Sequence, residues 1–276
     1  MESLKGKVVL VTGASSGIGE ATARAFGVEG CRVVLAARRL ERLQAVAADL
    51  EAAGGETLAV AADLSRLDDI RSLTAQSLER FGRIDILFNN AGVGRIDWLE
   101  NLDPEKDIAS QFAVNVLGVI QTTRQVLPVM IRQTSGHIIN MASIAGLVAA
   151  PTYTVYAASK FAVRGFSEAL RREVSPWGIR VSVIYPGGVA TEFGAHAGIK
   201  RRTMVTTPKW LVLQAEDVAR AVVGLARRPR ANLVHPWPFA IGALANQLFP
   251  WLVDASTVRG FTIPERIEEL KAAGLR

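Results

Sequence analysis

The sequence contains a single cysteine, Cys31, among its 276 residues. One thiol cannot form a disulfide within the chain, so nothing in the composition points to an oxidising compartment. We expect Cys31 to be a small buried side chain, because it opens an apolar run. The amino terminus lacks a signal-peptide pattern and leads straight into another apolar run. These features predict a cytoplasmic protein.

The chain also lacks a clear membrane-spanning segment and a basic stripe. The apolar stretch 235–253 is too short and too interrupted, by Pro250 and the pair Asn246 and Gln247, for a transmembrane helix of about 20 apolar residues. The net charge of +6 suits a phosphorylated ligand, although a scattered basic surface explains it equally simply. The basic residues do not alternate with aromatic ones in a stripe, so we expect no nucleic-acid partner.

Short apolar runs alternate with helical patterns along most of the chain, whose length is compatible with one large domain. The runs are expected to be strands buried on both faces, at residues 7–12, 32–37, 55–62, 84–88, 136–142, 179–185 and 231–234. Longer helices are expected at 65–81, 108–131 (broken near Pro128) and 264–273. Strands alternating with helices imply right-handed βαβ crossovers. We therefore predict an α/β fold with a doubly wound parallel sheet of about seven strands and helices on both faces.

A glycine-rich turn follows the first apolar run and opens a helix. Residues 13–19 read Gly-Ala-Ser-Ser-Gly-Ile-Gly. A turn of this kind places backbone N–H groups and a helix N-terminus where a pyrophosphate can bind. A plain strand–helix connection is the alternative, although it does not need the hydroxyls of Ser15 and Ser16. We assign cofactor contacts here to Gly13, Ser15, Ser16, Gly17, Ile18 and Gly19.

Two arginines, Arg38 and Arg39, follow the second apolar run, and no Asp or Glu stands there. In a dinucleotide-binding unit an acid at this point accepts from a free ribose 2′-hydroxyl, whereas an arginine accommodates a 2′-phosphate. A guanidinium fork suits the charge of that phosphate. This predicts NADP(H), with Arg38 as the main contact. Arg39 is equally well explained as the solvated start of the next helix.

Polar and small residues follow the third and fourth apolar runs. Asp63 is expected either to cap the next helix or to accept from an adenine amino group, and Leu64 adjoins it. Side-chain amides and small residues at a strand end let a flat ligand approach the backbone. Turn-forming and strand-bracing hydrogen bonds also explain the asparagines, and both roles can hold at once. The residues assigned to the cofactor here are Asp63, Leu64, Asn89, Asn90, Ala91 and Gly92.

Tyr156 and Lys160 lie four apart in a segment of helical character, so both can face the same space. A cation beside a phenol favours the phenolate and is expected to lower the phenol pKa from about 10 toward the working range. Tyr156 could then exchange a proton near neutral pH. Such a pair also occurs by chance on solvated helices, so it needs partners elsewhere in the chain.

Those partners give the chain a resemblance to the short-chain dehydrogenase/reductase family in its single-domain form. The resemblance covers roughly residues 5–234 and rests on residues 12–19, 89–92, Asn115, Ser143, Tyr156, Lys160, Pro186 and Gly187. It implies a Rossmann fold with a working catalytic set of Asn115, Ser143, Tyr156 and Lys160, in which Asn115 holds a water in a proton relay. It further implies that Pro186, Gly187, Val189 and Thr191 lie at the nicotinamide, with Tyr156 and Lys160 also contacting the cofactor. No metal site is implied.

The resemblance implies an NADP(H)-dependent oxidoreductase that interconverts a ketone or aldehyde and an alcohol, here expected to be apolar, with Tyr156 as general acid/base. Two alternatives stay open. One is an NADP(H)-binding regulator or scaffold. The other is a membrane-peripheral enzyme acting on lipids or sterols, suggested by Trp237, Phe239, Phe249 and Trp251.

We expect residues 1–235 to form one dinucleotide-binding and catalytic domain, with a substrate flap at about 192–214. That flap contains Trp210 and the basic cluster 200–202, for which a solvated loop is the alternative. Residues 236–276 are expected to be an extension, first apolar and then helical, packed on the same domain. Its apolar part is expected to cover the substrate pocket and to enter a homodimer or homotetramer interface; a membrane surface is the less favoured alternative.

Overall fold

The computed structural model describes residues 3–198, 209–272 and 274, and it contains a seven-stranded sheet in the order β3-β2-β1-β4-β5-β6-β7. All six strand pairings are parallel. The strands are β1 (Val8–Thr12), β2 (Arg32–Ala37), β3 (Glu56–Ala61), β4 (Ile86–Asn89), β5 (Gly136–Met141), β6 (Ile179–Pro186) and β7 (Asn232–His235). Each predicted strand is therefore present, with ends shifted by at most two residues.

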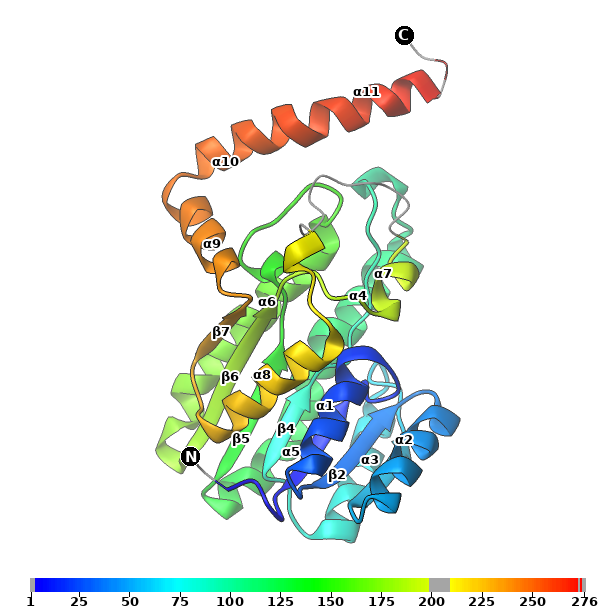
Figure 1. The fold of residues 1–276 in the computed structure, drawn as a ribbon, viewed down its shortest axis with the longest axis vertical. Coiled ribbons are helices and arrows are strands. Elements are labelled where there is room, and N and C mark those ends of the chain that lie inside the picture. Colours follow the sequence, from blue (N-terminus) through cyan, green and yellow to red (C-terminus); the bar gives the residue numbers. More distant parts are fainter. Residues whose placement is uncertain (1–2, 199–208, 273, 275–276) are drawn as a thin grey trace.

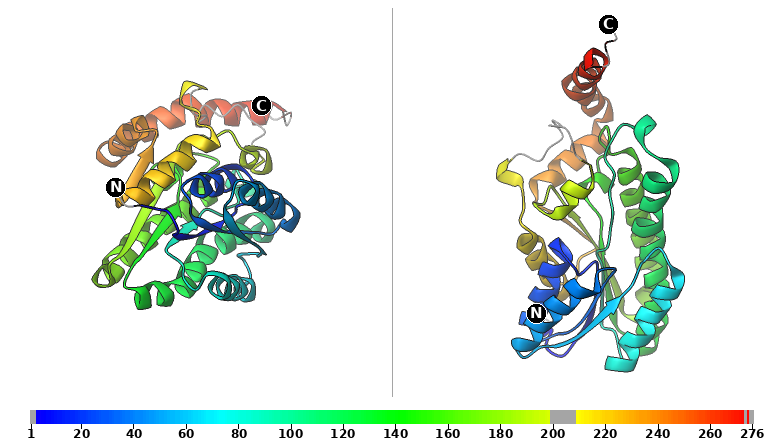
Figure 2. Two further views of the ribbon diagram at one scale, coloured as in Figure 1. Left: turned by 60° about the horizontal axis from the view of Figure 1, so that its bottom comes forward. Right: turned by 90° about the vertical axis from the view of Figure 1, so that its right-hand side faces the viewer.

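Helices cover both faces of the sheet (Figures 1 and 2). On one face lie α1 (Gly17–Val28), α2 (Leu40–Ala52) and α8 (Ala215–Arg227), which pack on strand residues such as Val9 and Val33. On the other lie α3 (Leu67–Phe81), α5 (Val119–Gln133) and α6 (Thr154–Val174), which pack on residues such as Val8 and Val34. Successive strand residues thus enter opposite cores, which explains the continuous apolar runs. The predicted doubly wound parallel sheet is confirmed.

The long helix predicted at 108–131 differs from the observed one. Helical structure begins at Pro104 and continues to the end of α5, through a π-helical turn at Pro104–Ala109, the short α4 (Ser110–Phe112) and a second π-helical turn at Ala113–Gly118. The expected break near Pro128 was wrong, because α5 runs through that proline to Gln133. A proline removes one backbone donor, and here the buried face of α5 keeps the helix in place. The irregularity lies instead around Asn115.

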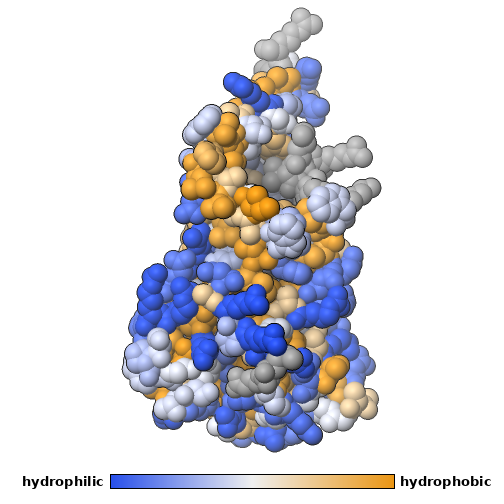
Figure 3. Space-filling model, turned by 60° about the vertical axis from the view of Figure 1, so that its left-hand side comes forward, coloured by the Kyte–Doolittle hydropathy of each residue, from blue (hydrophilic) through white to orange (hydrophobic). Residues whose placement is uncertain are grey.

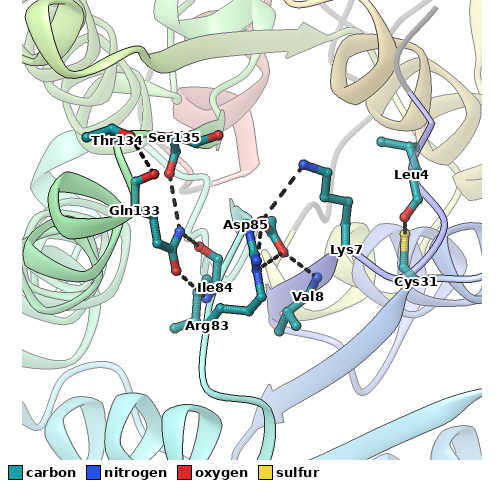
Figure 4. Close-up of polar contacts among 10 residues, drawn as sticks. All are labelled: Leu4, Lys7, Val8, Cys31, Arg83, Ile84, Asp85, Gln133, Thr134 and Ser135. Carbon is teal, nitrogen blue, oxygen red and sulfur yellow. Dashed lines mark hydrogen bonds and ion pairs between the residues drawn. The ribbon is translucent and has the colours of Figure 1, made fainter.

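Polar side chains fix the amino ends of the strands, at the edge drawn in Figure 4. Asp85 is buried, accepts from the backbone N–H of Val8 at 2.9 Å and pairs with Arg83 at 2.6 Å. Gln133, at the end of α5, bonds both the N–H and the carbonyl of Ile84, at 3.2 and 2.9 Å. These contacts join β1, the start of β4 and α5 at the edge opposite the one where parallel sheets bind ligands.

The carboxyl-terminal residues form α9 (Pro238–Leu248), α10 (Pro250–Thr257), a π-helical turn (Val258–Thr262) and α11 (Ile263–Ala272). The last three join into a rod across one end of the molecule (Figure 1). The rod is held by Phe261, which is buried against Trp98 at a ring distance of 6.2 Å, and by Arg266, which lies 3.7 Å from the Trp98 ring. Among the described residues, no helix combines the length and the hydrophobicity needed to cross a membrane.

Many apolar side chains of this extension remain exposed. Four of them lie three or four residues apart, from the N-cap of α9 to its last residue, so they share one face of the helix. Their side chains are 54 to 70% exposed: Trp237, Ile241, Leu244 and Leu248. Figure 3 shows hydrophobic side chains gathered over the upper part of the face that carries this helix. The extension therefore packs on the domain through a few aromatic contacts and leaves an apolar surface uncovered.

Candidate active site

The glycine turn 13–19 lies at the carboxyl end of β1, where parallel sheets bind ligands. Gly13 has φ +68° and Gly17 has φ +56°, in the left-handed region that favours glycine. A Cβ on Gly13 would lie 2.8 Å from Ala91 Cα, and one on Gly19 would overlap the Gly13 carbonyl. The chain therefore needs glycine at these positions both for the turn and for the close approach of the segment after β4.

This turn fits the phosphates of a dinucleotide. Ser16 stands at the N-cap of α1, a twelve-residue helix whose first N–H groups point toward the turn. Its hydroxyl accepts from Arg39 Nη2 at 2.9 Å, and Ser15 Oγ accepts from the same group at 3.1 Å. Hydroxyls, a guanidinium and a helix N-terminus thus surround one point, which is the donor set that a phosphate requires.

The two arginines after β2 lie in different places. Arg39 reaches the glycine turn, whereas Arg38 is exposed and acts electrostatically on Asp63. A third arginine, Arg42, joins Arg39: its Nη1 donates to Glu192 Oε1 at 3.0 Å, and Arg39 Nη1 lies 3.6 Å from Glu192 Oε2. Arg42 was missed from the sequence; it lies in the first turn of α2, three residues after Arg39, which stands at the N-cap of that helix.

Asp63 lies just beyond β3 and organises its own turn. Its Oδ1 accepts from the backbone N–H and the hydroxyl of Ser65, at 2.9 and 2.7 Å. Partial burial opposes ionisation, but the Ser65 bonds and the charge of Arg38 hold the pKa of Asp63 below its usual value. It does not cap α3, whose N-cap is Arg66, so the capping alternative was wrong. Leu64 is buried, with its carbonyl and Cβ close to Gly118.

The residues at the end of β4 and just after it brace the neighbouring elements. Asn89 is buried and donates to Thr123 and Asn140, so its side chain joins β4 to α5 and β5. Asn90 donates to the Thr12 carbonyl at 3.0 Å and so holds the loop against β1. Ala91 packs closely on Gly13. The predicted strand-bracing hydrogen bonds of the two asparagines are present, and their contact with a cofactor stays a prediction.

Ser143, Tyr156 and Lys160 come together at the carboxyl end of β5. Ser143 follows that strand, accepts from the Ala145 N–H at 3.2 Å and makes a side-chain hydrogen bond with Tyr156. Lys160 Nζ lies 5.6 Å from the Tyr156 ring centre and donates to the Met141 carbonyl at 3.1 Å. Tyr156 and Lys160 are both buried, at 8 and 4% exposure, in the first half of α6. The sequence-predicted trio is thus assembled.

The pKa of Tyr156 does not move in the direction that the sequence predicted. Burial raises it to about 12, and the hydrogen bond with Ser143 offsets only part of that effect. Burial lowers the pKa of Lys160 to about 8. The physical reason is that both groups are desolvated, and Lys160 gives its hydrogen bond to Met141 rather than to the phenol. At neutral pH the phenol is therefore protonated and can donate.

Asn115 lies beside this trio, inside the second π-helical turn. Its Oδ1 accepts from the Val93 N–H at 2.8 Å, and its Nδ2 donates to the Val93 carbonyl and to Ser159. A Cβ on Gly92 would lie 3.3 Å from Asn115 Oδ1 and 3.6 Å from Lys160 Nζ. Both polar atoms therefore lie close to the Gly92 backbone, where a side chain would crowd the amide oxygen, and that oxygen can accept a second hydrogen bond.

The segment after β6 closes the other side of the site. Gly187 donates to the His235 carbonyl, and its Cα is covered by Phe239 of α9, so that no Cβ would fit. Val189 bridges to Leu213, and Thr191 packs against Gly17, where a Cβ would lie 3.3 Å from the threonine methyl. Pro186 ends β6. The predicted nicotinamide segment thus spans from the extension to the glycine turn.

Two aromatic rings cover Tyr156. Phe193, from α7 (Glu192–His196), lies 5.6 Å from its ring centre, and Tyr153 lies 6.3 Å away in an edge-on arrangement. Part of the predicted flap, 199–208 with its basic cluster 200–202, lies outside the described residues. Phe193 was missed from the sequence, because a lone aromatic in an aperiodic stretch carries no signal of its neighbours.

Comparisons with known proteins agree with this geometry. Residues 7–201 match the sequence model of the short chain dehydrogenases. An uncharacterized oxidoreductase of Staphylococcus saprophyticus is 40% identical over 85% of this chain and 96% of its own length. A 3-oxoacyl-[acyl-carrier-protein] reductase of Synechocystis is 36% identical over 85% of this chain and 94% of its own length.

The solved structures include a short chain dehydrogenase/reductase from Burkholderia phymatum in complex with NAD. It has a TM-score of 0.83 and 30% identity, and the match covers 91% of this chain and 96% of that one. Sequence and fold thus agree over nearly the whole chain: the protein belongs to the short-chain dehydrogenase/reductase family of oxidoreductases.

Proposed function

We propose that the protein is an NADP(H)-dependent oxidoreductase that reduces a ketone or aldehyde to an alcohol and catalyses the reverse reaction. The observation that carries this proposal is the meeting of Ser143, Tyr156 and Lys160 at the carboxyl edge of the sheet, beside a glycine turn suited to phosphates. The reductase from Synechocystis, which is named for a 3-oxoacyl substrate, supports a carbonyl as the reacting group.

The hydroxyls of Ser143 and Tyr156 donate to the carbonyl oxygen of the substrate. Bound NADPH supplies the hydride for the carbonyl carbon. Tyr156 gives its proton to the developing alkoxide, which suits a phenol kept protonated by burial. The ammonium of Lys160 lies 5.6 Å from the ring centre, and a water held by Asn115 Oδ1 relays a proton from solvent back to the phenolate.

NADP(H) is favoured over NAD(H) by the arginines near the end of β2. Arg39 contacts Ser15 and Ser16 and shares Glu192 with Arg42, and Arg38 adds a third positive charge at the same end of β2. Three guanidinium groups suit a 2′-phosphate, and Arg38 remains our candidate for a direct contact together with Arg39. The NAD complex of the Burkholderia relative makes NAD(H) the competing assignment.

An apolar substrate is favoured by the rings around Tyr156. Phe193 and Tyr153 cover the phenol, and Phe239 brings the extension against Gly187 on the far side. A carbonyl bound between these rings would contact mainly carbon, with polar groups only at its oxygen. The exposed apolar stripe on α9 further supports a homodimer or homotetramer, since surfaces of this kind are covered in an assembly.

The test is consumption of NADPH and of NADH by the purified protein over carbonyl compounds graded from small polar ketones to steroids and long-chain acyl ketones. We expect turnover with NADPH on the bulky apolar members. Turnover with NADH alone would overturn the cofactor assignment. Tight NADPH binding without turnover on any carbonyl would favour the regulator alternative.

A further inference from the structure

The short helix α7 connects two parts of the site through adjacent residues. Glu192 contacts the arginines beside the glycine turn: its Oε1 accepts from Arg42 Nη1 at 3.0 Å, and its Oε2 lies 3.6 Å from Arg39 Nη1. The next residue, Phe193, lies 5.6 Å from Tyr156, ring centre to ring centre. A movement of this five-residue helix would therefore change both contacts together.

The contact of Glu192 with the arginines is one that an anion can replace. The side chains of Glu192, Arg39 and Arg42 are 47, 41 and 50% exposed, and ion pairs exposed to this extent are weak because water and salt screen them. A phosphate monoester carries about −1.5 to −2 charges and three acceptor oxygens. It can thus bind the same two guanidinium groups more strongly than one carboxylate does.

Phe193 limits access to the catalytic phenol where α7 now lies. Its Cζ is 2.5 Å from where a Cβ on Gly94 would be, so the ring fills the space between the loop after β4 and Tyr156. Tyr156 is only 8% exposed beneath it. The far end of α7 is tied to that same loop, where the Ile96 N–H donates to the Ala197 carbonyl at 2.9 Å.

We propose that Glu192 is a positioning residue that competes with the 2′-phosphate of the cofactor for Arg39 and Arg42 and so holds Phe193 over Tyr156. When the phosphate takes over both guanidinium groups, Glu192 is released and α7 can move Phe193 off the phenol. Opening of the substrate site is then coupled to the phosphorylated cofactor. This inference rests on the proposed function, because it needs a 2′-phosphate at these arginines.

The first test is binding, measured by calorimetry on Glu192→Gln without any turnover. The probes are adenosine 2′,5′-bisphosphate, adenosine 5′-monophosphate, NADPH and NADH. The substitution removes an exposed ion pair that competes with the phosphate. We therefore expect the dissociation constants of adenosine 2′,5′-bisphosphate and NADPH to fall by at least about threefold, while those of adenosine 5′-monophosphate and NADH stay unchanged. Glu56→Gln is the matched control, since Glu56 forms an exposed pair with Arg32 at 3.0 Å on the opposite edge of the sheet.

The second test follows α7 directly, by hydrogen exchange of a peptide spanning residues 192–198. In the unaltered protein, adenosine 2′,5′-bisphosphate should increase hydrogen exchange of this peptide, whereas adenosine 5′-monophosphate should not. In Glu192→Gln the exchange of the same peptide should already be raised without any ligand.

A weaker affinity of Glu192→Gln for NADPH, an equal change for NADPH and NADH, or protection of α7 by the bisphosphate would overturn the inference. Failure of the unaltered protein to bind NADPH would instead overturn the proposed cofactor itself.

Discussion

At the scale of single residues, Tyr156 and its neighbour Tyr153 give an internal comparison. Both carry one hydroxyl, but only Tyr156 hydrogen-bonds Ser143, next to buried Lys160. A proton donor aimed at a developing alkoxide contributes several kcal/mol, so we expect Tyr156→Phe to lower turnover by roughly 10²-fold or more. NADPH affinity should stay near that of the unaltered protein.

Tyr153→Phe is the control and should keep turnover within about threefold, because its hydroxyl makes no contact with the reacting group in our assignment. Steady-state kinetics and NADPH titration measure both variants. Near-normal turnover of Tyr156→Phe would contradict its role as the acid.

Lys160 gives a second prediction, about stability. Burial lowers its pKa to about 8, so its charged form weakens the fold below that pH. This cost disappears as the pH rises through 8 toward the unfolded value of about 10.4, because the unfolded chain then binds more protons than the folded one. Lys160→Met should therefore raise the unfolding free energy at pH 7, by about 1 to 3 kcal/mol, while abolishing activity.

Urea unfolding at pH 7 and pH 9.5 checks this prediction. The advantage of Lys160→Met should shrink at the higher pH, where the wild-type lysine loses its charge. A variant less stable than the wild type at pH 7 would mean that the bond to Met141 outweighs the desolvation of the ammonium.

At the scale of elements, Asp85 decides how β1 and β4 meet at their amino ends. It is buried, and its removal leaves the Val8 N–H without its acceptor and Arg83 without its partner. We expect Asp85→Ala to lower the unfolding free energy by about 2 to 4 kcal/mol, measured by urea denaturation.

The control for this prediction is Asp68→Ala, since Asp68 is 85% exposed and, among the residues that the structure describes, pairs with Arg71 nearby on α3 and with no other. It should change stability by less than about 0.5 kcal/mol. Equal effects of the two substitutions would mean that the bonds of Asp85 do not hold the strands together. The affinity for NADPH should change little in either variant, because Asp85 lies at the edge opposite the site.

At the scale of the whole molecule, the apolar stripe on α9 predicts an assembly. Leu244 and Leu248 are 54 and 59% exposed, one turn apart. The double substitution Leu244→Glu with Leu248→Glu should dissociate a dimer or tetramer into monomers of 29.7 kDa in sedimentation velocity, because charges disfavour burial in an interface.

Val28→Glu is the control, because Val28 is an isolated apolar residue, 88% exposed on α1. It should leave the assembly intact. A protein that is monomeric before substitution and co-sediments with liposomes only while Leu244 and Leu248 are present would favour the membrane-peripheral alternative instead.

The sequence by itself determined the parts of this protein that depend on short spacings. Continuous apolar runs alternate with helices because strands are buried on both faces, and this pattern predicted the sheet and each strand to within two residues. The family resemblance came from motif residues at fixed spacings, such as the glycine turn and the pair Tyr156 and Lys160. The glycines at 13 and 17 were identifiable because only glycine adopts their backbone angles readily. The four-residue spacing of Tyr156 and Lys160 placed both on one face of a helix.

Tertiary structure alone decided what depends on distance between remote segments. Burial depends on neighbours, so the sequence missed that desolvation raises the pKa of Tyr156 and lowers that of Lys160. It missed Glu192 beside Arg42, because 150 residues separate them along the chain. The sequence also predicted a helix break at Pro128, which was wrong. Contacts with other elements stabilise the helix on both sides of that proline, and a local pattern does not reveal them. Local pattern fixes each element, but the environment of a side chain is set by whatever the fold brings against it.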